Sequence, residues 1–168
     1  MQSLPKREAR ILGVSSATSK DEIITVGVVY RGSLWLDGIV CSRVNVAEPE
    51  YTFKISRTIE FTKQFPQLHA VMLSRELNRK ISISELYRMT GVPVLATYNS
   101  PTTSKGSRMS GVRQFCLLVN GKPLWVMASG IRKEEAERLY NIGCSPGSRL
   151  PEAVRVARIL SERLRDCL

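Results

Sequence analysis

Three short apolar runs follow one another near the start of the chain, at residues 11–14, 23–30 and 34–41. Val, Ile and Leu dominate them, and each run has about the length of a strand. The second break is Arg31-Gly32-Ser33, a tight-turn composition in which glycine can take a positive φ. No helix keeps its period through this break, so the runs predict a three-stranded antiparallel meander.

The length and the ends of the chain set further expectations. A chain of 168 residues is long enough to bury a core without disulfides or metals, and it is expected to form a single domain, 1–168. It has no long apolar run, so no membrane span is expected. The first seven residues carry charge with no apolar segment behind them, which predicts no secretory signal and a cytoplasmic location.

The nucleophilic and metal-binding side chains are sparse. The four cysteines are far apart in sequence and His69 is the single histidine, so the chain lacks the ligand spacing of a zinc site. A Cys–His pair or a Ser–His–Asp triad would have to use His69. Because His69 opens the apolar run 69–73, a structural role is favoured for it.

Positive charge is concentrated in the second half of the chain. The net charge is +10, and no Asp or Glu occurs between Glu85 and Glu134. Such a surface attracts phosphates, which makes DNA or RNA the expected partner and leaves a solvated basic surface as the alternative. The cations of this span are Arg88, Lys105, Arg108, Arg113, Lys122, Arg132 and Lys133.

The middle of the chain predicts parallel strands joined by helices. Residues 51–65 fit both a strand and a helix, and a helix is favoured because Pro66 ends it and the apolar run 69–73 needs a crossover before it. Ser82 and Glu85 form a capping-box pattern for a short helix that ends at Gly91. The apolar run 92–98 follows as a strand, and Pro93 suits the edge of a sheet.

The last third predicts a hairpin and two helices. Residues 99–110 are polar and are expected to form a long exposed loop, while Asn120-Gly121 between two apolar runs is a strong hairpin signal. A helix is expected over 133–142, and Pro151 is expected in the first turn of the last helix. The buried stripe expected on that helix is Ala153, Ala157, Leu160, Leu164 and Leu168.

Several motifs resemble those of endonuclease V and its archaeal relatives. The run 150–158, LPEAVRVAR, resembles the Pro-Glu-Pro-Leu-Arg-x-Ala-His run near the end of that family, and 10–14, RILGV, is similar to its opening strand. The likeness covers nearly the whole chain and is greatest to an uncharacterised archaeal family, the domain of unknown function ninety-nine. It implies an α/β fold with a ribonuclease H-like mixed sheet: the antiparallel meander, then parallel strands with crossover helices, and endonuclease V-like additions.

The resemblance also implies a metal-dependent endonuclease ancestry, and the chain departs from it at the metal ligands. Where the family's opening strand delivers an Asp, the chain has Ser15-Ser16, and where its fourth strand ends in Asp-Gly, the chain has Ser74-Arg75. Glu50 stands at the place of a further acid. Neutral hydroxyls are weak ligands for Mg²⁺, so a degenerate site with no metal or cofactor is expected, and Mg²⁺ only if the site is active.

Basic residues around the vacant site are expected to suit phosphate better than metal. Arg158 stands where the relatives carry His, and Arg155 belongs to the same motif on an apolar helix face, where it is expected to reach a carbonyl or an acid such as Glu50. The candidate nucleic-acid-binding residues are Arg75, Lys105, Arg108, Arg113, Arg155 and Arg158.

Three functions remain open at this point. The first is an endonuclease V-like protein that binds nucleic acid with weak or no nuclease activity, and the second is a structural or protein-interaction module. The third is an active metal-dependent endonuclease with a rearranged site of Glu48, Glu50 and Glu76. The sequence also leaves open whether residues 34–36 or the hairpin at Asn120 form a dimer surface.

Overall fold

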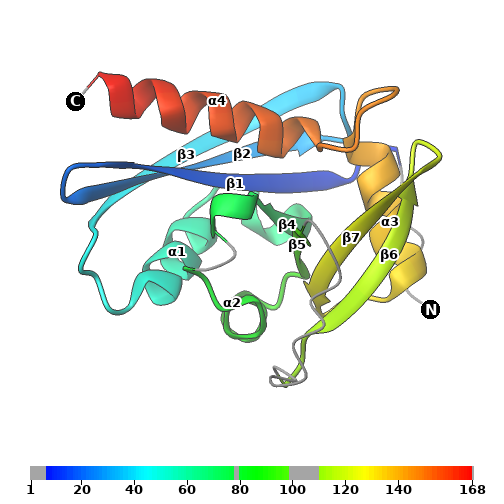
Figure 1. Ribbon diagram of the computed structural model, residues 1–168, viewed down its shortest axis with the longest axis horizontal. Helices are drawn as coiled ribbons and strands as arrows, with labels where there is room; N and C mark the ends of the chain where they lie inside the picture. The colour runs from blue at the N-terminus through cyan, green and yellow to red at the C-terminus, as the bar shows by residue number, and fades with distance from the viewer. Residues whose placement is uncertain (1–6, 78–79, 99–109, 168) are drawn as a thin grey trace.

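A seven-stranded mixed sheet forms the centre of the computed structural model, which describes residues 7–77, 80–98 and 110–167 (Figure 1). The strand order is β3-β2-β1-β4-β5-β7-β6. The first three strands pair antiparallel, which confirms the meander. They are β1 Arg10–Ser19, β2 Glu22–Arg31 and β3 Trp35–Asn45.

Strand β1 is longer than its apolar run indicated. It continues through Ser15, Ser16 and Ala17, all of which are buried. The polar segment between the first two apolar runs is therefore mostly strand, and the turn is confined to Lys20 and Asp21, where Lys20 takes a positive φ of 48°. Helices cover both faces of β1, an environment in which strands are usually apolar throughout, so these buried hydroxyl side chains are unusual there.

Parallel strands extend the meander, as expected. Strand β4 (Leu68–Leu73) pairs parallel with β1, and β5 (Val94–Tyr98) pairs parallel with β4. Helix α1 (Tyr51–Glu60) lies between β3 and β4 in the chain, and helix α2 (Ile83–Thr90) lies between β4 and β5. The mixed α/β fold class is thereby confirmed. The ambiguous segment 51–65 is a helix only as far as Glu60, and Pro66 does not end it, because Pro66 lies in the separate 3₁₀ turn Phe65–Gln67.

The edge position expected from Pro93 is wrong. Strand β5 lies between β4 and β7, well inside the sheet. Pro93 is compatible with this place because the strand begins one residue later, and the Pro93 carbonyl oxygen accepts a hydrogen bond from the Val71 N–H, at 2.8 Å. The ladder therefore needs no donor from Pro93.

The ends of α2 confirm most of the capping prediction. The Ser82 hydroxyl accepts a hydrogen bond from the Glu85 N–H, and Gly91 ends the helix with a left-handed φ of 69°. The second half of the capping box is replaced by a tertiary contact, since the Ser82 N–H donates to the Thr52 hydroxyl of α1, at 3.1 Å. Helix α2 is thus attached to α1 at its first turn.

The predicted hairpin is formed by β6 (Arg113–Val119) and β7 (Lys122–Ser129). Asn120 and Gly121 at its turn have positive φ values of 48° and 73°, as a two-residue turn of this type requires. Because β7 also pairs antiparallel with β5, the hairpin extends the sheet and β6 becomes its edge. Helix α3 (Lys133–Gly143) packs against β6.

Helix α4 (Glu152–Asp166) lies over β1 and β2 (Figure 1). A Cβ built at Gly13 would collide with the backbone of Ala153 and Val154, so glycine permits this close approach. Pro151 is the residue before the helix rather than part of its first turn.

The buried stripe of α4 differs from the expected one. Ala153 and Ala157 are buried as expected, but Val154 and Ser161 are buried with them, and Leu164 is exposed. The helix is therefore rotated toward the side that carries Val154 and Ser161. Leu160 is half-buried, and Leu168 lies outside the described residues.

Alternate residues of the central strands feed two apolar clusters. Ile11 and Met72 pack toward α3 and α4, whereas Leu12 and Val71 pack toward α1 and α2. Within the described ranges, no helix combines the length and the apolar character needed to cross a membrane. The alternation also sets which face each later residue of β1 and β4 occupies.

Candidate functional site

The middle of β1 meets the carboxyl end of β4 beneath α4. The two strands pair in parallel with Val14 beside Leu73, and the Ser74 N–H donates to the Val14 carbonyl oxygen, at 2.8 Å. Ser15 and Ser74 are therefore at neighbouring positions, on the sheet face that α4 covers. Their exposed fractions are 0% and 3%, and neither hydroxyl has a hydrogen-bond partner among the described residues.

Ser16 lies in a different environment. By the alternation of β1 it faces α1, where it and Thr25 are hydrogen-bonded to the Tyr51 hydroxyl. Burial raises the pKa of Tyr51, and the two hydrogen bonds act in the opposite direction. The expected Ser15-Ser16 pair is thus divided between the two faces of the sheet.

A cleft of about 540 Å³ opens beside Ser74. It lies between the ends of β4 and β5, the start of β7 and one side of α4. Three arginines and two aromatic rings contribute to its wall. These charged and aromatic residues are Arg75, Glu76, Tyr98, Trp125, Arg149 and Arg158.

The charge of this cleft is positive. Arg158 contacts Glu76 at 3.8 Å between nitrogen and oxygen, and it contacts Glu162 at 3.1 Å. Arg149 donates to the Pro123 carbonyl oxygen at 2.7 Å, a bond that positions the guanidinium without neutralising it. With Arg75 at the rim, three arginines face one lining glutamate, a balance that attracts phosphate.

Two aromatic side chains complete the cleft. The rings of Tyr98 and Trp125 are 6.3 Å apart between centroids and inclined by 43°. The Tyr98 hydroxyl is buried without a hydrogen-bond partner in the described part of the chain, and burial raises its pKa. Aromatic faces next to arginines can stack on the bases of a nucleic acid.

The acids expected at a metal site are separated. Glu50 precedes α1, is exposed, and lines a different pocket of about 490 Å³ together with Glu48. Glu76 lines the cleft beside Ser74. Among the residues that the structure describes, no group of three or more His, Cys, Asp or Glu side chains could hold a metal ion.

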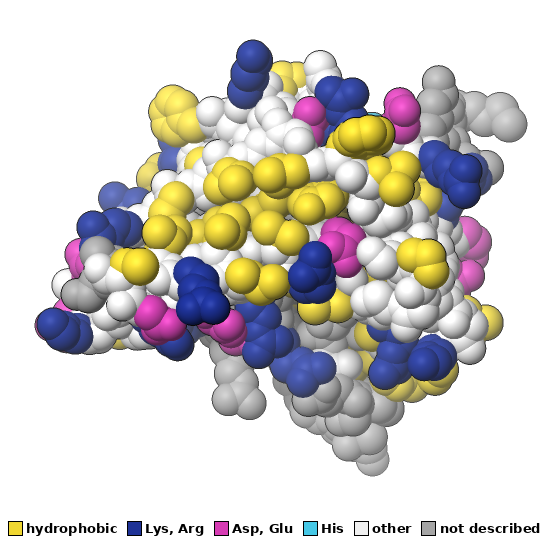
Figure 2. Space-filling model, turned by 90° about the horizontal axis from the view of Figure 1, so that it is seen from above, with side chains coloured by type: hydrophobic (Ala, Val, Ile, Leu, Met, Phe, Trp, Pro, Cys, Tyr) yellow, Lys and Arg dark blue, Asp and Glu magenta, His cyan; other side chains and the backbone are white. Residues whose placement is uncertain are grey.

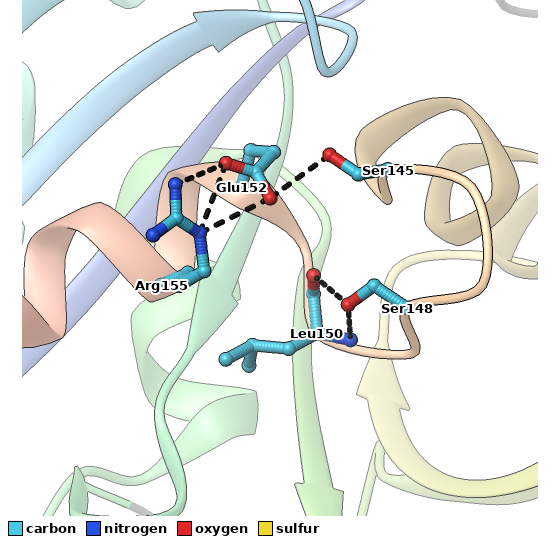
Figure 3. A network of polar contacts seen from close by, with 5 residues as sticks. All are labelled: Ser145, Ser148, Leu150, Glu152 and Arg155. Atoms are coloured by element: carbon cyan, nitrogen blue, oxygen red, sulfur yellow. Dashed lines mark hydrogen bonds and ion pairs between the residues drawn. The ribbon is translucent and has the colours of Figure 1, made fainter.

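Arg155 has an acid partner other than the one expected (Figure 3). Its guanidinium makes a two-pronged contact with Glu152 on the same helix, with the shortest nitrogen–oxygen distance at 2.7 Å. The Ser145 hydroxyl donates to the same carboxylate, at 3.0 Å. Glu50, the partner named from the sequence, does not take part, and Arg155 does not line the cleft.

The other candidate cations are distributed as follows. Arg75 and Arg158 lie in the cleft, whereas Arg113 lines another pocket, of about 1000 Å³, with Arg88 and Arg132. Lys105 and Arg108 lie outside the described residues. The candidates therefore do not form one surface within the described structure.

Sequence reasoning missed Arg149 and Trp125. Arg149 belongs to a linker that carried no recognisable motif, and Trp125 lies in a hairpin strand whose position in the sheet was not predicted. The antiparallel pairing of β5 with β7 places Trp125 opposite Tyr98. The sequence signal that could have indicated Trp125 is a tryptophan within a hairpin that follows a basic segment.

The sequence of the chain is similar to those of archaeal proteins. Over 93% of its length the chain is 28% identical to a UPF0215 protein of Methanosarcina acetivorans, of which the alignment spans 90%. The chain resembles the archaeal UPF0215 proteins. No family model matches it. The resemblance to an uncharacterised archaeal family is confirmed, and the domain-family number ninety-nine stays a prediction.

Two solved structures share the fold. A protein of unknown function from Archaeoglobus fulgidus has a TM-score of 0.77 at 17% identity, with 93% of this chain and 98% of that one covered. An endonuclease V from Streptomyces avermitilis has a TM-score of 0.60 at 18% identity, with 97% and 84% covered. The expected endonuclease V-like fold is confirmed by this likeness.

Proposed function

We propose that the chain is an endonuclease V-like protein with a degenerate metal site that binds nucleic acid and has weak or no nuclease activity. The observation that carries this proposal is the pair Ser15 and Ser74, buried side by side next to a cleft rich in arginine. Part of the same proposal is that residues 1–168 are one endonuclease V-like domain located in the cytoplasm.

The chemistry of the cleft suits binding better than hydrolysis. Mg²⁺ prefers carboxylate oxygens, and Ser15 and Ser74 offer neutral hydroxyls instead. A serine nucleophile needs an adjacent base, but His69 lies near the start of β4, at the opposite end from Ser74, and its Nδ1 accepts the Arg10 N–H at 3.2 Å. Arginine forks remain, and they match the geometry of phosphate oxygens.

The test is a titration with labelled single- and double-stranded DNA and RNA at several salt concentrations. The Arg75→Ala, Arg149→Ala, Arg158→Ala triple variant should reduce the slope of log affinity against log salt by roughly two to three units, because each phosphate contact contributes about 0.9. The matched control replaces Arg57, Arg163 and Arg165 by Ala, which removes the same charge elsewhere.

Two outcomes would contradict the proposal. An equal change of slope in both triple variants would show a general charge effect with no role for the cleft. Efficient cleavage of any of these nucleic acids in Mn²⁺ or Mg²⁺, lost in Glu76→Ala or Glu50→Ala, would favour the active enzyme with a rearranged site.

An interaction module is the second candidate, and one observation favours it. The edge strand β3 exposes large apolar side chains, among them Trp35 and Ile39, at 63% and 55%. Exposed apolar surface of this kind marks sites of protein association. If no nucleic acid binds even at low salt, this second function takes the place of the first.

A further inference from the structure

Strand β3 is an edge of the sheet, because β2 is its one neighbour in the strand order of the described residues. Along an antiparallel strand, successive residues direct their backbone groups to alternate sides. The Val46 N–H donates to the Asp21 carbonyl oxygen at 2.7 Å, which continues the β2–β3 register. From Gly38 onward the even-numbered residues of β3 therefore face β2, and Ile39, Cys41 and Arg43 direct their N–H and C=O groups outward.

The same odd-numbered residues expose their side chains on the face that carries α4. Helix α4 packs on β1 and β2, so Ile39 and Cys41 at the edge are left exposed. Val156 and Leu160 of α4 are half-buried against β2, next to them. Figure 2 views this side and shows hydrophobic side chains gathered into a band with charged side chains around it.

The sequence of β3 is complementary to itself when two copies run antiparallel about Val40. The pairs are then Ile39 with Cys41, Gly38 with Ser42, Leu36 with Val44 and Asp37 with Arg43. Apolar residues meet apolar ones, small residues meet small ones, and an acid meets a base. Contacts of this kind stabilise antiparallel pairs, and a two-fold axis requires that one surface fit itself.

We propose that β3 pairs with β3 of a second copy, with the two-fold axis at Val40, so that two sheets join into one. Ile39 and Cys41 of opposite copies then form hydrogen-bonded pairs through their outward backbone groups, and the two Val40 residues form a non-hydrogen-bonded pair. The apolar band beside α4 becomes continuous across the axis.

Features next to Asp37 limit the length of the shared ladder. The β2–β3 register shifts between Val29 and Tyr30, and the Gln64 side chain donates to the Asp37 carbonyl oxygen, at 2.8 Å. Asp37 is already paired with Arg10 and Arg31 of its own chain, at 2.7 and 3.0 Å, so Arg43 of the second copy would add to an existing ion-pair cluster and contribute little to the contact. The shared ladder is therefore short and centred on Val40, and burial of side chains supplies the rest of the contact between the two copies.

Disulfide cross-linking tests the register directly. Cα atoms of a non-hydrogen-bonded antiparallel pair are about 4.5 Å apart, within the range that a disulfide spans. In a Cys41→Ser background, Val40→Cys should therefore form a covalent dimer under mild oxidation, seen by non-reducing electrophoresis. Two controls should cross-link far more slowly: Ser42→Cys, which would face Gly38, and Leu118→Cys on the other edge strand, β6.

Sedimentation equilibrium tests the association without any added cysteine. The wild-type chain should approach twice its monomer mass as concentration rises, and Ile39→Lys should weaken dimerisation at least about tenfold because two lysines would flank the axis. Ile159→Lys, also on an exposed apolar position, should leave the dimer intact. A wild-type chain that stays monomeric, or a Leu118→Cys variant that cross-links as fast as Val40→Cys, would overturn the proposal.

Discussion

The backbone N–H of Ser74 donates a hydrogen bond to the carbonyl oxygen of Val14, at 2.8 Å, where β4 ends beside the middle of β1. This bond places Ser74 next to Ser15 under α4. The hydroxyl oxygens of both serines are buried without a partner among the described residues. Buried polar groups are normally hydrogen-bonded, so this pair departs from a purely structural core.

Ser74→Ala should stabilise the protein. A buried hydroxyl without a partner loses its hydration on folding, and removing it should raise the free energy of unfolding by about 1 kcal/mol. Ser161→Ala is the matched control, because the Ser161 hydroxyl is equally buried but donates to the Arg158 carbonyl oxygen at 3.0 Å. Urea denaturation measures both, and a Ser74→Ala variant that loses stability to the same extent as Ser161→Ala would contradict this view.

Divalent metal should have little effect on the wild-type protein and a clear effect on a variant with carboxylates restored. Ser15→Asp with Ser74→Asp places two acids at neighbouring buried positions, where their repulsion destabilises the fold until Mg²⁺ or Mn²⁺ neutralises it. We expect metal to raise the melting temperature of the double variant alone. Calorimetry that finds a tight, stoichiometric site in the wild type, abolished by Glu50→Ala, would refute this prediction.

Arg155→Ala should lower the melting temperature more than Arg163→Ala. The first substitution leaves the mostly buried Glu152 carboxylate without its guanidinium partner, whose own side chain is 47% exposed. Because solvent screens that pair, a loss of about 1 kcal/mol is expected. Arg163 is exposed on the same helix and provides the control. Equal and negligible shifts in thermal melts would show that the Arg155–Glu152 contact contributes nothing.

The contribution of Glu152 should depend on pH. The hydrogen bond from Arg155 lowers the pKa of Glu152 from its ordinary value of 4.5, although burial acts to raise it. A lowered folded-state pKa stabilises the protein above the ordinary value, and this contribution is lost as pH falls from 4.5 through the folded-state pKa. Glu152→Gln should therefore destabilise the protein at neutral pH and match the wild type in acid.

Denaturation curves at several pH values make this comparison. Glu162→Gln is the control, because Glu162 contacts Arg158 on the exposed side of the same helix. A difference between wild type and Glu152→Gln that persists unchanged in strong acid would mean that the substitution acts through packing and not through charge.

Local signals predicted most elements of the fold. The apolar runs, the Asn120-Gly121 turn and the Ser82 cap each act over a few residues, and each prediction is confirmed. The edge position of Pro93 was wrong because strand order depends on which distant strand pairs with β5, and the hairpin that does so lies later in the chain. The rotation of α4 was missed because it depends on the contact of its backbone with Gly13.

The sequence by itself determined that serines, and not carboxylates, stand at positions 15 and 74, because residue identity does not depend on the fold. It also determined the basic character of the chain, which is a matter of composition. The tertiary structure alone decided which charged and aromatic side chains share a cleft. Arg149 and Arg158 lie there together, as do Trp125 and Tyr98, whereas Glu50 and Arg155 lie elsewhere. The physical reason is that a cleft forms where elements distant in sequence pack together, and residue spacing carries no record of that packing.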